Sequence, residues 1–149
     1  MTSLSRLILG LWFGGGTILL AVATPAAFRG AGDPARAAEI VGAMLRPWHW
    51  LAIGAPLVVL ILTASGGRRG ARVVILAVAL LFAVAQTVVD ARIHAIRRSS
   101  PVSISSLAKS DPVRRRFGML HGASSMLMLL EVVAAGAALW VESAVSSKL

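Results

Sequence analysis

Residues 71–93 read ARVVILAVALLFAVAQTVVDARI and establish the fold class of this chain. The segment is apolar over a length that crosses a bilayer as a helix, which takes roughly 20 residues. Because a spanning segment must satisfy its own backbone hydrogen bonds, and because the strict alternation of a barrel strand is missing, we predict a transmembrane α-helix. Gln86 and Asp90 interrupt its apolar surface one helical turn apart.

Three further segments have the same apolar character, so the sequence predicts an all-α protein, an integral membrane four-helix bundle. The predicted spans cover residues 4–28, 48–64, 71–93 and 117–141 of a single domain that extends over residues 1–149. This length leaves no room for a second domain of ordinary size. For the first span a cleaved secretory signal is the alternative, because Arg6 precedes an apolar run with small residues at 21–23.

The polar link between the first two spans predicts a further element. Asp33-Pro34 is typical of a helix N-cap followed by proline at the first helical position. Residues 35–45 would then form a short amphipathic helix on the membrane surface, with Glu39 and Arg46 on its solvated side. Residues 66–70, Gly-Gly-Arg-Arg-Gly, predict a tight turn, and Ser110-Asp111-Pro112 is the start signal of the last helix.

The composition supports a membrane protein and excludes several other classes. Apolar residues make up 57% of the chain and charged residues 14%, against about 45–50% and about 25% in ordinary soluble domains. The net charge of +9 comes from basic residues placed between apolar runs, as in the loops of membrane proteins. Since tyrosine is absent and aromatic residues are 5%, we expect no nucleic-acid partner. The absence of cysteine excludes thiol catalysis and cysteine-ligated metals.

The basic residues also predict how the chain sits in a bacterial inner membrane. Four spans place both termini and the turn at 65–70 on one membrane face, face B, and the links at 29–47 and 92–116 on the opposite face, face A. Face A carries ten Lys and Arg residues, and face B carries five: Arg6, Arg68, Arg69, Arg72 and Lys148. Because short loops rich in Lys and Arg stay in the cytoplasm, we expect face A to be cytoplasmic and both termini to lie outside.

Three histidines are the first candidates for chemistry, since imidazole serves as base, metal ligand or haem ligand. His49 is predicted to open the second span, His94 to follow the third and His121 to lie in the first turn of the fourth, so all three should lie near face A. Asp90 joins that layer, and a metal site built from several helices has this arrangement. The alternative is a set of interfacial polar residues, since no two histidines share a helix.

Glu131 is the most informative intramembrane polar residue, together with Gln86 and Asp90. At 1.5 Å per residue it lies about 15 Å beyond His121, near the middle of the bilayer. A carboxylate there costs several kcal/mol unless it is protonated, paired or hydrated, so we expect a neutral acid that faces the helix interior, with Thr17 or Gln86 as partner. A proton relay is the functional interpretation, and a hydrogen bond that fixes helix packing is the alternative.

Short motifs along the chain resemble those of a known family. Trp12-x-Gly14 followed by Pro25-x-x-Phe28 is similar to its opening signature, and residues 38–45 are similar to its next segment. Phe117-x-x-Leu120-His121-Gly122, with the serines at 124 and 125, is similar to its entry to the last helix. The family is a bacterial domain of unknown function that is similar to eukaryotic transmembrane protein 205. The resemblance implies a four-helix membrane domain of unestablished activity, marked by Trp12, Gly14, Pro25, Phe28, Phe117, His121 and Ser125.

These observations favour a non-enzymatic inner-membrane protein, a scaffold or accessory subunit without a cofactor, because the sequence holds no convergent catalytic set. The expected partners are the lipid bilayer and either a second copy or a membrane complex, since the glycine pairs 10/14 and 118/122 allow helices to approach closely. Two alternatives remain. One is a small proton-coupled transporter that uses Glu131, Gln86 and Asp90, and the other is a redox protein that binds haem or a metal through the three histidines.

Overall fold

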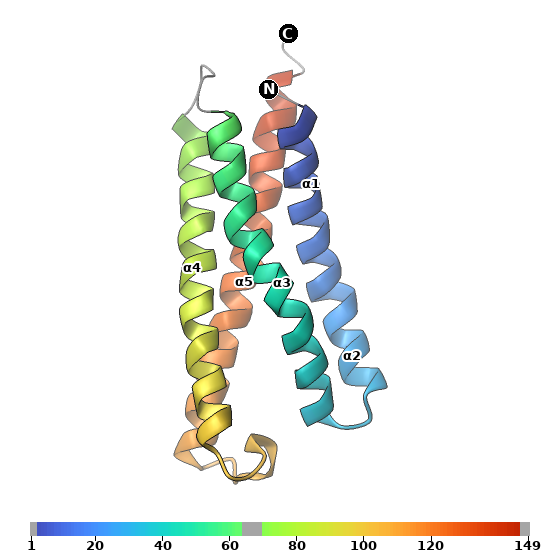
Figure 1. Cartoon of the computed structure of the whole chain (residues 1–149), viewed down its shortest axis with the longest axis vertical. Coiled ribbons are helices and arrows are strands. Elements are labelled where there is room, and N and C mark those ends of the chain that lie inside the picture. Colours follow the sequence, from blue (N-terminus) through green and yellow to red (C-terminus); the bar gives the residue numbers. More distant parts are fainter. Residues whose placement is uncertain (1–2, 64–69, 147–149) are drawn as a thin grey trace.

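The computed structural model describes residues 3–63 and 70–146 of the chain. Long helical segments run side by side in alternating directions, and the start of the first lies at the same end as the end of the last (Figure 1). The predicted all-α class is confirmed for the described residues, which contain no strand. Four segments are long and apolar enough to cross a membrane: Ser3–Gly30, Pro34–Leu62, Gly70–Ser99 and Pro112–Val141.

The first segment is one helical path made of three elements: α1 (Ser3–Ile18), η1 (Leu19–Ala23) and α2 (Thr24–Gly30). η1 is a π-helical turn, and the N–H of Thr24 donates to the carbonyl of Leu19 at its end. The wide turn comes just before Pro25, which lacks the N–H that a regular helix would use there. After α2, Gly32 has a φ of +68°, which glycine adopts without steric penalty, and the chain reverses direction.

α3 (Pro34–Leu62) corrects the expectation of a separate surface helix at residues 35–45. The predicted start is right, because the Asp33 carboxylate accepts two backbone N–H groups at 3.1 and 3.4 Å. The helix then continues without a break through Pro47 into its apolar half. Proline removes one backbone hydrogen bond, whereas ending the helix at membrane depth would leave several backbone groups unpaired and costs more.

α4 (Gly70–Ser99) and α5 (Pro112–Ser146) also extend beyond the predicted spans, and they pack chiefly on each other. The link between them contains a short 3-10 turn, η2 (Ile104–Ser106). Asp111 caps α5 as predicted, since its carboxylate accepts the N–H of Val113 at 2.7 Å. The predicted turn at residues 66–70, with Arg68 and Arg69, and Lys148 near the C-terminus lie outside the described residues, except that Gly70 begins α4.

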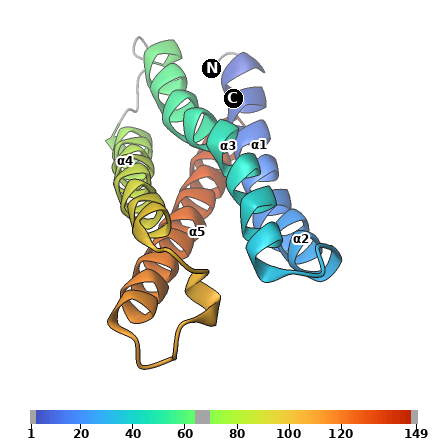
Figure 2. The ribbon, with the colours of Figure 1, turned by 60° about the horizontal axis from the view of Figure 1, so that its bottom comes forward.

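The tightest packing brings α1 against both α3 and α5. A Cβ built on Gly16 would lie 2.5 Å from a methyl group of Val132 and 2.6 Å from the Trp48 ring, so only glycine fits there. Around this contact the core is built from buried residues of all four segments, among them Trp12 of α1, which is fully buried. Towards the opposite end of the molecule, α2 and the first half of α3 diverge from α4 and α5 (Figures 1 and 2).

We predict that Gly16→Ala lowers the free energy of unfolding by about 1–3 kcal/mol, because the added methyl group overpacks the contact. Thermal unfolding in mild detergent measures the effect. Gly10→Ala is the matched control on the same helix, since a Cβ at Gly10 meets nothing within 4 Å. The control should be neutral or gain up to about 1 kcal/mol from helix propensity. Equal stability of both variants would show that Gly16 does not set the helix spacing.

Candidate functional site

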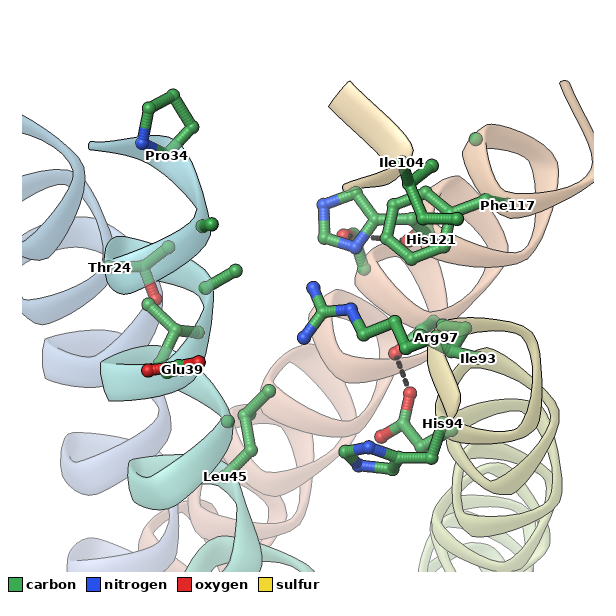
Figure 3. A pocket seen from close by; sticks show the side chains of 18 of the residues that line it. Thr24, Pro34, Glu39, Leu45, Ile93, His94, Arg97, Ile104, Phe117 and His121 are labelled. Atoms are coloured by element: carbon green, nitrogen blue, oxygen red, sulfur yellow. Dashed lines mark hydrogen bonds between the residues drawn. The ribbon is translucent and has the colours of Figure 1, made fainter. Parts of the chain in front are cut away.

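A cleft of about 700 Å³ lies between the diverging helices, at the end of the molecule that holds the links 31–33 and 100–111. One wall consists of α2 with the end of η1 and the first half of α3. The other consists of the second half of α4, the first half of α5 and part of the link between them. Figure 3 shows Thr24, Glu39 and Leu45 on the first side, opposite Arg97 and His121. We call this hollow the cleft.

Asp90 connects three helices at the inner end of the cleft. Its carboxylate accepts the hydroxyl of Ser124 from α5, with 2.6 Å between the oxygens, and lies 2.8 Å from Nε2 of His49 from α3. The histidine contact is short, but the N–H geometry is not that of an aligned hydrogen bond, so it is an electrostatic contact. Polar contacts between helices are strongest where water is excluded. The contacts of Asp90 therefore help to hold α3, α4 and α5 together at the inner end of the cleft.

Glu131 lies directly behind this cluster and is fully buried, as its predicted inward position requires. Its carboxyl interacts electrostatically with His49 and Asp90 and is close to the Trp48 indole. Neither carboxyl oxygen has a hydrogen-bond partner of good geometry among the described residues. The expected partners are therefore wrong, because the Thr17 hydroxyl donates to the carbonyl of Phe13 instead, 2.8 Å away.

The three histidines all line the cleft but at different depths, since His49 contacts Asp90 at the inner end and His121 belongs to the outer part. Their places within the helices differ from the prediction. His49 lies in the middle of α3, His94 lies inside α4 and His121 lies in the third turn of α5. The difference arises because the helices continue past the apolar spans to the caps at Asp33 and Asp111. Within the described residues, no three His, Cys, Asp or Glu side chains gather closely enough to hold a metal ion.

An aromatic and cationic stack forms the outer part of the second wall. The rings of Phe117 and His121 are stacked, with centroids 6.1 Å apart and an interplanar angle of 9°. The guanidinium carbon of Arg97 lies 5.3 Å from the Phe117 centroid, which is a cation–π contact. Arg114 donates to the carbonyls of Ser105 and Leu107 and holds the link against α5.

The residues marked by the family resemblance fall into two groups. Phe28, Phe117, His121 and Ser125 line the cleft. Trp12 belongs to the buried core, and Gly14 and Pro25 line neither the cleft nor the tight contact at Gly16. The marked residues therefore include part of the candidate site, mainly on α5.

Sequence reasoning missed several residues of the cleft. Glu39 and Arg46 were expected on a solvated helix side, and both are exposed, but they also line the cleft because α3 is continuous and leans away from α4. Arg97 was considered only as one of the ten basic residues of face A. A signal for it was present: Gln86, Asp90, Ile93 and Arg97 recur at helical spacing and continue one stripe along α4.

Comparison with known proteins places most of this chain in a family. Residues 7–101 match the family described as "Domain of unknown function (DUF4149)". The match covers α1 to α4 and does not extend to α5, where Phe117, His121 and Ser125 lie. No curated protein and no solved structure matches the chain.

We predict that Ser124→Ala lowers the free energy of unfolding by about 0.5–1.5 kcal/mol, because the partly buried Asp90 carboxylate loses its donor. Ser125→Ala is the control, since that hydroxyl only donates to the carbonyl of His121 in its own helix. Its effect should stay within about 0.5 kcal/mol. Thermal unfolding of both variants in the same detergent compares them, and equal losses would rule out a special role for the Ser124–Asp90 contact.

Proposed function

We propose that this chain, which belongs to the DUF4149 family of domains of unknown function, is a non-enzymatic accessory protein of the bacterial inner membrane that binds a ligand in its cleft. The observation that carries the proposal is the cleft itself, a hollow of about 700 Å³ with charged, imidazole and aromatic groups on its lining. Pockets of this size hold small ligands and usually combine apolar walls with a few polar groups.

The shape of the cleft favours binding over transport. At its inner end the helices close on a packed core that includes Leu76, Ala79 and Ala135, each fully buried. A ligand can thus enter from one end, while the described residues offer no continuation toward the other end. The polar groups present are suited to hold a ligand, and the Ser124 hydroxyl and the Asp90 carboxylate are joined to each other as a contact between α5 and α4.

A four-span bundle in the membrane is part of the same proposal. Four long apolar helices support a multi-pass membrane protein. A second copy or another membrane protein would complete the assembly through the apolar side chains that the helices expose, such as Trp50 and Trp140, which are 79% and 75% exposed.

We further propose that the cleft opens on the cytoplasmic side. The excess of basic residues on face A supports this orientation, because Lys and Arg near span ends are retained in the cytoplasm. A reporter that is active only in the periplasm should therefore work when fused after Leu149. A reporter that is active only in the cytoplasm should be silent there, and the reverse pattern would invert the orientation.

Gly118→Leu tests the binding function. Gly118 lines the cleft and a Cβ there meets nothing within 4 Å, so the new side chain takes up ligand space without a clash. We expect about tenfold less co-purifying ligand in native mass spectrometry, which corresponds to about 1.4 kcal/mol of lost binding. Gly122→Leu is the control one turn further along α5, where a Cβ also meets nothing within 4 Å.

The two variants should unfold at similar temperatures, so a difference in bound ligand reports on the cleft. Equal ligand in both variants would contradict the proposal. If Glu131→Gln folds normally and abolishes the cellular phenotype while Gly118→Leu keeps it, the proton-coupled transporter replaces it. If the retained molecule is haem or a metal and is lost on His94→Ala or His121→Ala, the redox alternative replaces it.

A further inference from the structure

We propose that the cleft recognises a zwitterionic phospholipid headgroup, with the phosphate at Arg97 and a primary ammonium at Glu39. The inference rests on the proposed ligand-binding function and names the chemical class of the ligand. It is carried by three features of the described residues: the contrast between the two walls, the stacking of Arg97, and the charges that have no partner.

The two walls of the cleft differ in polarity. The wall from η1, α2 and α3 presents mostly apolar side chains, such as Leu20, Phe28 and Leu45. The wall from α4 and α5 presents polar ones, such as Gln86, Asp90, His94 and His121. A molecule that fits both walls has an apolar body and a polar head, because each part is then transferred to an environment of its own kind.

Arg97 is held in a way that leaves its donors available. Its guanidinium carbon lies 5.3 Å from the centre of the Phe117 ring, which is itself stacked on His121. No carboxylate of the described residues forms an ion pair with Arg97. A cation–π contact does not use up the N–H donors of a guanidinium, and these donors match the oxygens of a phosphate in a bidentate arrangement.

Most of the other charged side chains that line the cleft already interact with other groups of the protein. Asp90 is engaged by His49 and Ser124, and Arg114 donates to backbone carbonyls of the link. Arg46 is exposed and is shared with a second, smaller hollow outside the cleft, next to Trp50. Apart from Arg46, Glu39 and Arg97 remain as opposite charges on opposite sides of the cleft (Figure 3).

The Glu39 carboxylate indicates whether the cleft favours an anionic or a zwitterionic lipid headgroup. A head with only negative charge would bring its charge near the Glu39 carboxylate in a partly dehydrated cleft, where like charges repel strongly. A head that also carries a primary ammonium offers each of the two side chains a group of opposite charge. Ethanolamine phospholipids have this combination of a phosphate and an ammonium group.

Both charges lie near helix ends, at the end of the molecule that holds the cleft. Glu39 is five residues from the start of α3 and Arg97 is two residues from the end of α4, which places them about 8 Å and about 3 Å from those helix ends. The polar layer on each side of a bilayer is about 5–8 Å thick. Where these helix ends reach the membrane surface, a lipid can enter the cleft from the adjoining leaflet without moving its head out of that layer.

The test is a lipid competition on the purified full-length protein in mild detergent. Equimolar phosphatidylethanolamine and phosphatidylglycerol are added, and native mass spectrometry counts the lipids retained. We expect several-fold more phosphatidylethanolamine than phosphatidylglycerol on the wild type. Arg97→Gln should reduce retention of both lipids by about tenfold, the scale of a lost charge-assisted hydrogen bond. Glu39→Gln should keep the total and bring the ratio of the two lipids close to one.

Arg92→Gln is the matched control, since Arg92 is an exposed arginine of α4 that does not line the cleft. It should leave both the amount and the ratio unchanged. A wild type that prefers phosphatidylglycerol, or an Arg92→Gln loss as large as that of Arg97→Gln, would overturn the inference.

A third arm separates the lipid from a soluble compound with the same chemistry. Phosphoethanolamine, which has the headgroup without acyl chains, is offered at the same concentration. Retention of phosphoethanolamine without retention of the lipid would overturn the lipid assignment. If Gly118→Leu removes a bound molecule while Arg97→Gln and Glu39→Gln change nothing, the cleft binds a ligand of another class. The proposed function then stands and this inference fails.

Discussion

The close approach of α1 to α3 and α5 at Gly16 is the constraint on which the arrangement of the helices depends. Because that position has no side chain, the Trp48 ring and Val132 fill the space beside α1. This contact joins the first, second and fourth segments at one level. Beyond it α2 and α3 lean away from α4 and α5, so the same contact that closes the core also determines where the cleft begins.

The polar cluster of His49, Asp90 and Ser124 lies where the packed core ends and the cleft begins. His49 follows Trp48 in the chain, so the residue that packs on Gly16 also positions the imidazole that reaches Asp90. Helices in an apolar medium gain little from apolar contact with each other, and packing and interhelical hydrogen bonds hold them together. The link from α3 through Asp90 to Ser124 therefore complements the tight packing at Gly16.

The helical class and the two helix caps could be predicted because their causes are local. Asp33 and Asp111 cap backbone groups within three residues, and an apolar run in lipid has few alternatives to a helix. The cleft could not be predicted, because the lean of α3 depends on which side chains meet across helices. For the same reason the place of Glu39 in the cleft was missed. Glu131 was assigned partners by depth alone, which gives the height along the helix but not the residue that it faces.

Pro47 lies in α3 between the wall of the cleft and the packed half of the helix. Like Pro56 further along α3, it supplies no N–H to the carbonyl four residues earlier, so the backbone ladder lacks a hydrogen bond at this level. The part of α3 after Pro47 packs into the core, whereas the part before Pro47 borders the cleft. A bend at Pro47 would therefore tilt Pro34–Arg46 and change the width of the mouth of the cleft while the packed half kept its place.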